Sequence, residues 1–379
     1  MTGTFFRSAA CGLFLVATLA PARAAPDAET VAALMAAAVA ATGEATLTYD
    51  SVAADGDTVT LTGVKLTATA EDGNVVAVPA LIVNGVSERA TGGFTATRMT
   101  FDGGTAAARG NAASWTTAAV EEVVIPSAEE IKARATVRPF KRIAFAGLNL
   151  AGVDFAAPID AATAAVEIGD VAADAPANVL LRATGVKLPT ALLTNSLVNT
   201  VVGMLRYDEF LADITMDSEY DGARDTVIIH ALTLDAANVG KITIAGKASA
   251  FSLRGLTDRE KSAEARANAR LDSLTVRIDN AGFVERMLDM QAELLGGTRD
   301  DVRAQLVLGA LPFALSFVKE EAFRDQFLAA MTAFLENPQS LTVTFAPSTP
   351  VPLGKAMRTA ARSPADLPGL LAPTVQANN

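Results

Sequence analysis

The sequence has few of the residues on which metal binding and catalysis most often depend. Its 379 residues include one cysteine, one histidine and one tryptophan. One histidine and one cysteine cannot build a multi-histidine or Cys/His metal cluster. Basic residues are outnumbered, with 31 Lys and Arg against 42 Asp and Glu and a formal net charge of −11. This balance argues against a broad nucleic-acid-binding surface, which needs a basic patch, and we expect no nucleic-acid partner.

Apolar residues, in contrast, are abundant. They make up 50% of the chain, although only 6% of the residues are aromatic, and this composition is too apolar for a disordered protein. The length suits one large domain or two medium ones. The longest apolar run, Leu306 to Val318, is shorter than the roughly 20 residues of a spanning helix and contains Pro312. We therefore expect no transmembrane span in the mature chain.

Residues 1–24 are typical of a secretory signal peptide. Arg7 gives a positive start, an apolar stretch begins at Cys11, and Ala22-Arg23-Ala24 places small residues before a cleavage site after Ala24. The other interpretation is a buried N-terminal helix. The signal peptide predicts a periplasmic or secreted protein, and its removal takes away the only cysteine, so no disulfide is expected.

Residues 25–188 are predicted to be β-rich after a short N-terminal helix over 28–41, with Asp27 as its N-cap. Alternating apolar residues predict strands over 58–69 and 75–83 with a turn between them. The apolar residues change parity at certain glycines, and this pattern predicts β-bulges with positive φ in a curved antiparallel sheet. The glycines are Gly63, Gly147 and Gly185, with a weaker copy at Gly85.

Residues 189–379 are predicted to combine a helix, a strand meander, a helical layer and C-terminal strands. In chain order we expect a helix over 189–205, strands over 212–217, 227–234, 241–250 and 265–278, helices over 283–295, 298–318 and 320–335, a strand over 341–345, a short helix over 354–361 and a strand over 370–376. The predicted fold class is α+β, with curved antiparallel sheet packed against three or more helices. Whether 25–188 and 189–379 form one continuous domain is open.

Two patterns offer catalytic candidates. His230 lies on a predicted strand among apolar residues, and a Ser-His-Asp arrangement would have to use it; a packed strand histidine is the simpler interpretation. Ser316 and Lys319 match S-x-x-K, in which a lysine activates a serine, but the accompanying S-D-N and K-T-G motifs are missing. We therefore expect no catalytic residue, and keep a hydrolase using His230 or Ser316 as the alternative.

One acidic run resembles the first half of an EF-hand loop. Its carboxylates alternate before Gly222, as ligands of a hard cation do, but the twelfth position is Ile228 instead of a glutamate. A polar hairpin turn is the simpler interpretation, and we expect neither a metal nor a cofactor. The metal candidates are Asp217, Glu219, Asp221 and Asp225.

Two other segments allow two interpretations each. An acid-free basic stretch is either a solvated strand face or a contact for an anionic envelope component; it contains Lys132, Arg134, Arg138, Lys141 and Arg142. The segment 305–318 is apolar nearly all round, and such a helix is usually buried in a core. The other interpretation of that segment is a wall that faces lipid or an acyl chain.

The signal peptide, the glycine-interrupted strands and the missing catalytic motifs together resemble the β-rich envelope proteins of Gram-negative bacteria that hold or shield lipids, the AsmA-like group among them. The resemblance implies a non-enzymatic protein whose partner is a lipid or amphiphile, or an envelope protein. A purely structural interaction protein is a further alternative, and an exposed apolar patch without a pocket would indicate it.

Overall fold

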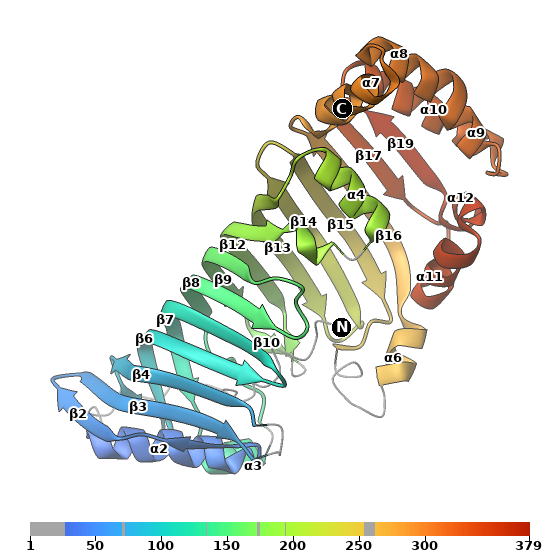
Figure 1. The fold of residues 1–379 in the computed structure, drawn as a ribbon. Helices are drawn as coiled ribbons and strands as arrows, with labels where there is room; N and C mark the ends of the chain where they lie inside the picture. The colour runs from blue at the N-terminus through green and yellow to red at the C-terminus, as the bar shows by residue number, and fades with distance from the viewer. Residues whose placement is uncertain (1–26, 70–72, 134, 173–174, 194, 254–261) are drawn as a thin grey trace. The chain divides into compact units, whose positions relative to one another are not determined.

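The computed structural model describes residues 27–379 except 70–72, 134, 173–174, 194 and 254–261. The predicted signal peptide therefore lies outside the described residues. The fold is α+β, as predicted: seventeen of the described strands are built into antiparallel sheet that is not closed into a barrel, and helices gather in the C-terminal part (Figure 1). The chain divides into two compact units, the first ending at Leu192 and the second beginning at Leu193.

Unit 1 is an antiparallel meander with few helices. Its strands pair in the order β3, β4, β6, β7, β8, β9, β12, and β1 and β2 both pair with β3. The elements are α2 (Ala28–Ala41), β1 (Ala45–Thr48), β2 (Ser51–Asp55), β3 (Thr58–Ala68), β4 (Val75–Asn84), β5 (Ser87–Glu88), β6 (Phe94–Ala108), β7 (Asn111–Ile125), α3 (Ala128–Lys132), β8 (Arg142–Gly152), β9 (Ile159–Ile168), β10 (Val171–Ala172), β11 (Ala175–Pro176), β12 (Asn178–Pro189) and the 3-10 turn η1 (Thr190–Leu192).

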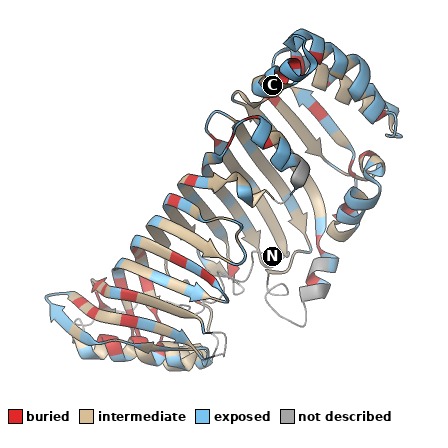
Figure 2. Ribbon diagram, in the orientation of Figure 1, coloured by how far each residue is buried: buried red, intermediate tan, exposed pale blue. Residues whose placement is uncertain are grey.

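The core of unit 1 lies between helix α2 and strands β3 to β7. Asp27 accepts a hydrogen bond from the backbone N–H of Thr30, so the predicted N-cap is confirmed. One side of the helix, with Val31 and Ala32 fully buried, packs on a sheet face whose central residues include Leu61 and Phe94. Figure 2 shows the buried residues gathered in these strands.

A line of positive-φ glycines crosses the sheet of unit 1. On alternate strands a glycine with φ between 59° and 75° faces a residue of the neighbouring strand, and a Cβ on most of these glycines would collide with that neighbour. We call this the glycine line. From β3 to β12 it consists of Gly63, Pro79, Gly103, Thr116, Gly147, Ala162 and Gly185, with Asp50 facing Gly63 from the β1–β2 connection.

Buried residues change parity at the glycine line, as the sequence pattern indicated. On β3, for example, Leu61 and Val64 belong to the same core although they are three residues apart. The positive φ predicted at Gly63, Gly147, Gly185 and Gly85 is confirmed. The bulges are not confirmed, because strand register is equal on both sides and no extra residue is present: Thr62 pairs with Ala80 and Val64 with Val78.

Unit 2 contains a second antiparallel meander and most of the described helices. The strand order is β13, β14, β15, β16, β17, β19, and β18 also pairs with β16. The elements are α4 (Ser196–Met204), β13 (Glu209–Asp221), β14 (Thr226–Ala236), β15 (Gly240–Ser249), α6 (Ser262–Asn268), β16 (Arg270–Asn280), α7 (Phe283–Leu295), α8 (Arg299–Gln305), the π-helical turn η2 (Leu306–Ala310), α9 (Leu311–Leu315), α10 (Glu321–Glu336), β17 (Ser340–Phe345), β18 (Val351–Pro352), α11 (Leu353–Arg362), the 3-10 turn η3 (Pro364–Asp366), α12 (Leu367–Leu371) and β19 (Pro373–Ala377).

Two strands of unit 2 carry a true extra residue. Asp217 pairs with Ala231 and Ser218 with Ile229, so His230 is the extra residue of β14. Lys247 pairs with Ser273 and Ala248 with Leu271, so Asp272 is the extra residue of β16.

Two predicted elements of unit 2, one strand and one helix, are wrong in part. The strand expected over 265–278 begins only at Arg270, after helix α6; alternating alanines imitate a strand there, but Ala, Glu and Arg are strong helix formers. The helix expected over 298–318 has a π-helical turn, Leu306–Ala310, before Pro312. Pro312 has no N–H with which to continue the α-helical bonding, so the irregularity precedes it.

Candidate functional site

The sheet of unit 2 has one continuous apolar face. Strand register aligns large aliphatic residues in two neighbouring rows, the first running from Ile214 and the second from Met216. Because side chains alternate along a strand, these rows share one face of the sheet. We call their residues the apolar floor: Ile214, Leu234, Ile242 and Ile278 in the first row, Met216, Leu232, Ile244, Val276 and Val343 in the second, and Leu274 beside it.

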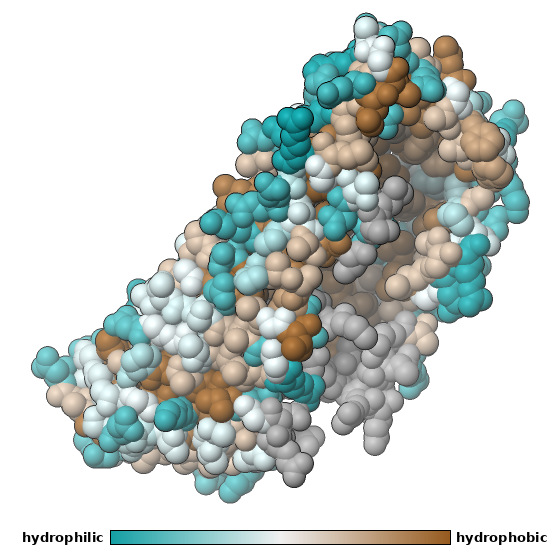
Figure 3. All heavy atoms as spheres, viewed as in Figure 1, coloured by the Kyte–Doolittle hydropathy of each residue, from teal (hydrophilic) through white to brown (hydrophobic). Residues whose placement is uncertain are grey.

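The described helices cover the borders of this face but not its middle. Helices α7, α8 and α10 pack over Leu341, α11 and α12 pack over Phe345, and α4 with α7 packs over Phe210. No residue of the apolar floor belongs to the clusters that the described helices form. Ile242 and Ile278, which pair across β15 and β16, are 38% and 39% exposed, and the other floor residues are half-buried. Figure 3 shows hydrophobic residues on the floor of a hollow in this region.

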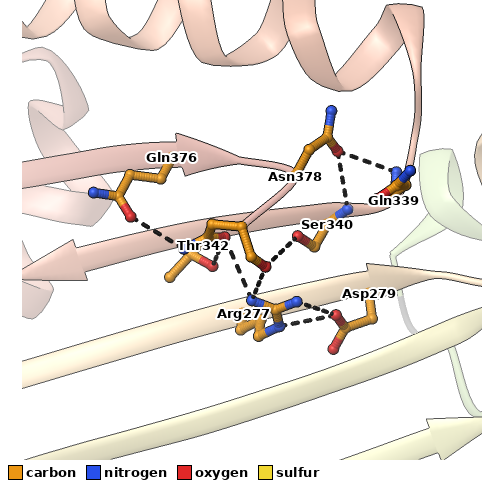
Figure 4. Close-up of polar contacts among 8 residues, drawn as sticks. Arg277, Asp279, Gln339, Ser340, Thr342, Gln376 and Asn378 are labelled. Atoms are coloured by element: carbon orange, nitrogen blue, oxygen red, sulfur yellow. Dashed lines mark hydrogen bonds and ion pairs between the residues drawn. The ribbon is translucent and has the colours of Figure 1, made fainter.

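The opposite face of the same strands is polar. Thr215, Thr233 and Thr243 form a row that continues into Arg277 and Thr342. Figure 4 shows the contacts at its end, where Arg277 donates to Asp279 at 2.8 Å and Asn378 accepts from the backbone N–H of Ser340 at 3.2 Å. The Ser340–Asn378 bond ties the end of β19 to β17, and Arg277 ties it to β16 by donating to the backbone oxygen of Asn379 at 2.8 Å. The two faces therefore differ in character: one is aliphatic, and the other carries a row of threonines that ends in charged and amide side chains.

Ser316 and Lys319 are not arranged as a nucleophile and its base. The hydroxyl of Ser316 donates to the carbonyl oxygen of Phe313 at 2.6 Å, a local bond common for serine in helices. Lys319 Nζ lies 2.7 Å from Asp366 Oδ1. The hydrogen bond to Asp366 raises the pKa of Lys319, which keeps the amine protonated. A lysine that serves as a base needs the opposite shift.

His230 has a carboxylate neighbour but no hydroxyl neighbour among the described contacts. Its Nε2 lies 3.4 Å from Glu219 Oε2, and both side chains are about half exposed, at 49% and 48%. A catalytic triad would need a serine or threonine hydroxyl on the other side of the ring. The arrangement is an exposed His-carboxylate pair in which His230 is the extra residue of β14.

The four metal candidates do not converge. Asp217 and Glu219 follow one another along β13, and Asp221 accepts hydrogen bonds from the backbone N–H groups of Ala223 and Arg224. Desolvation acts to raise the pKa of Asp221, but these hydrogen bonds and the Arg224 guanidinium hold it below its ordinary value. Asp225 accepts from the hydroxyl of Tyr220 at 2.9 Å, across the turn. In the described part of the chain no group of three or more His, Cys, Asp or Glu is placed to hold a metal ion.

The basic stretch of unit 1 is largely neutralised by acids of neighbouring strands. Arg138 and Lys141 each lie 2.8 Å from a carboxylate oxygen of Glu122. Arg142 lies 3.2 Å from Glu121 and 3.5 Å from Glu167. Arg134 lies outside the described residues. These pairs favour a solvated strand face over a surface for anions.

A second hollow, not found from the sequence, lies on the sheet of unit 1. Its volume is about 590 Å³, with a floor of small residues from β7, β8 and β9, such as Ala119, Ala144 and Ala165. Arg98, Arg142, Arg182, Asp102 and Glu167 stand around it. Charges of both signs line this hollow, so neither an anionic nor a cationic ligand is favoured.

Comparisons with known proteins give no activity. A family model described only as an uncharacterized protein matches residues 233–378, which run from β14 to the end of β19 and include the apolar floor apart from Ile214, Met216 and Leu232. No curated protein matches the chain. Among the described helices, none combines the length and hydrophobicity that crossing a membrane would require.

Proposed function

We propose that the protein binds a single-chain amphiphile, such as a fatty acid, on the apolar floor of unit 2. In this proposal it is an exported, non-enzymatic protein of the bacterial envelope, as the composition of residues 1–24 suggests. The observation that carries the proposal is the row of aliphatic side chains across the sheet, which none of the described helices covers and in which Ile242 and Ile278 are more than a third exposed.

The size of the floor suits an acyl chain. Five neighbouring strands, spaced about 4.8 Å apart, give a row about 19 Å long from β13 to β17, and an extended long acyl chain is comparable. Covering aliphatic groups with a hydrocarbon chain removes apolar surface from water on both sides, at about 25 cal/mol per Å². We also infer that the sheet bends and twists more strongly at its two extra residues, His230 and Asp272.

The chemistry of the floor favours ligand binding over hydrolysis. All ten floor residues are uncharged and carry no hydroxyl or amide, so the polar head of the ligand would remain at the rim. A hydrolase would need a polar cleft in which His230 contacts both a hydroxyl and a carboxylate, and only the carboxylate of Glu219 is beside it in the described structure.

A fluorescence titration with a dansyl-labelled fatty acid tests the proposal. The double variant I242Q/I278Q keeps side-chain length but places amides on the floor, and we expect its Kd to rise at least about tenfold, equivalent to about 1.4 kcal/mol. Thr215→Gln, on the opposite face and exposed, is the matched control and should bind as the wild type does.

Thermal unfolding of the three proteins shows whether the variants are folded. Saturable binding that is lost only in the floor variant supports the proposal. No saturable binding by the wild type, or equal affinity in I242Q/I278Q, would contradict it and favour a purely structural protein.

A further inference from the structure

A charge-free segment forms an exposed ridge at one border of unit 2. From Ala304 to Val318 the chain has no Asp, Glu, Lys or Arg, although 19% of all residues are charged. Arg303 and Lys319 stand directly at its two ends. The segment comprises the end of α8, the turn η2 and helix α9, and we call it the uncharged ridge.

The expectation that this segment is buried in a core is correct for its inner side and wrong for its outer side. Its inner side packs with α7 and α10 through Leu306, Val307 and Leu311. Its outer side carries Leu308, Phe313 and Phe317, at 81%, 71% and 64% exposed. The other exposed residues of the ridge are also uncharged: Ala304, Gln305, Gly309, Ala310, Pro312, Ala314 and Ser316.

This outer side is built unlike the surface of a helix that faces water. Solvent-facing sides normally carry charged and polar residues, whereas here the two phenylalanine rings contact each other edge to face with centroids 5.6 Å apart. The inner contacts hold the backbone in place, so the aromatic side chains are presented on a fixed support. Such an arrangement favours an apolar environment outside the ridge.

The three large exposed side chains of the ridge do not by themselves supply the apolar area of a stable interface with a second copy. Two phenylalanines and a leucine offer on the order of 400 Å² of apolar surface, about half of the roughly 800 Å² that each partner contributes to a standard interface. A bilayer surface requires no matching patch, because apolar side chains enter the boundary between headgroups and acyl chains.

Basic residues lie beside the ridge. Lys319 joins its end to η3 by the 2.7 Å contact with Asp366, and helix α11 directly precedes η3. The segment 353–365 has no acidic residue. On α11, Lys355, Arg358 and Arg362 are exposed, together with Met357 at 71%. The C-terminal end of α11 thus connects through η3 to the end of the ridge, and the exposed cations of α11 would attract anionic headgroups.

We propose that the uncharged ridge inserts into the surface of a lipid bilayer that contains anionic headgroups, with the basic side of α11 lying against those headgroups. Leu308, Phe313 and Phe317 enter the acyl boundary, and Lys355 and Arg358 contact the phosphates. This inference does not depend on the ligand of the apolar floor.

Co-sedimentation with phosphatidylcholine vesicles, with and without phosphatidylglycerol, tests the inference. The wild type should sediment with the anionic vesicles, and L308S/F313S/F317S should bind them at least about tenfold more weakly. The matched control is L294S/L295S, which removes two exposed leucines of α7 outside the ridge, at 68% and 59% exposed; it should bind as the wild type does. K355Q/R358Q should lose the preference for phosphatidylglycerol.

Two further measurements separate the proposals. The ridge variant should retain fatty-acid binding, and I242Q/I278Q should retain vesicle binding, so each can fail alone. Light scattering reports oligomeric state. Equal sedimentation of the ridge variant and the wild type would overturn the inference. It would also be overturned if the wild type is a dimer that does not bind vesicles and the ridge variant is a monomer.

Discussion

Replacing Arg89 by methionine is expected to lower the free energy of unfolding of unit 1 by about 3–5 kcal/mol. Arg89 Nη1 and Nη2 donate to the two carboxylate oxygens of Glu130 at 2.8 and 2.9 Å. Only 7% and 15% of the two side chains are exposed. The variant leaves the Glu130 carboxylate buried without its cation, which is what makes the loss large. Urea unfolding followed by circular dichroism measures it.

The same pair predicts how stability depends on pH. Burial acts to raise the pKa of Glu130, but the hydrogen bonds from Arg89 and the backbone of Ser127 hold it below its ordinary value. A carboxyl whose pKa is lowered by folding stabilises the protein above its unfolded pKa, about 4.3 for glutamate, and this contribution disappears as the pH falls through the folded value. The acid limb of the stability profile should therefore be flatter in E130Q than in the wild type.

The matched control for Arg89 is Lys141→Met. Lys141 also lies 2.8 Å from a glutamate oxygen, that of Glu122, but both side chains are about half exposed. Solvent-exposed pairs contribute little, so K141M should unfold close to the wild type. Equal losses in R89M and K141M would show that burial of the Arg89–Glu130 pair is not what makes it important.

Replacing Gly93 by alanine is expected to destabilise unit 1 by about 3–5 kcal/mol. Gly93 is buried, has φ +71°, and a Cβ there would lie 2.2 Å from the carbonyl oxygen of Ile125. That oxygen belongs to the backbone of β7, so the collision can be relieved only by moving a strand. The midpoint of urea unfolding measures the effect.

Gly56 provides the comparison that separates strain from collision. It has φ +60°, but no atom lies within 4 Å of the position of its Cβ. Gly56→Ala should therefore cost only the left-handed conformation, about 1–2 kcal/mol. If G93A and G56A lose the same stability, the close approach of β7 does not contribute.

Much of the fold follows from local sequence rules, and the exceptions have physical causes. The helix after its N-cap Asp27 and helix α7 over 283–295 match their predictions, because helix ends are set by residues within a few positions of them. The stretch at α6 was predicted as a strand because its alternating alanines fit the two-residue period of a strand as well as a helix. The two longest strands, β6 and β7, were not predicted, since their apolar residues change parity twice.

The candidate site was less accessible from the sequence. Alternation along β13 to β17 predicted the strands, but whether helices cover an apolar face depends on contacts between distant segments. By their sequence pattern, Ile242 and Ile278 are ordinary core residues. They are partly exposed because α4, α10 and α11, among the described helices, pack at the borders of the floor and not over these two side chains. For the uncharged ridge, the absence of charge from 304 to 318 was the available signal, and burial was the wrong inference for its outer side.

The glycine line makes the hairpin the unit of growth of the unit 1 sheet. Its glycines lie on β3, β6, β8 and β12, so every second strand supplies the residue with positive φ and each intervening strand supplies its neighbour. Strand register is unchanged on both sides of the line. A hairpin that carries one glycine at this level could therefore be added or deleted without disturbing the pairing of the rest, which gives evolution a simple route to related proteins of different sheet width.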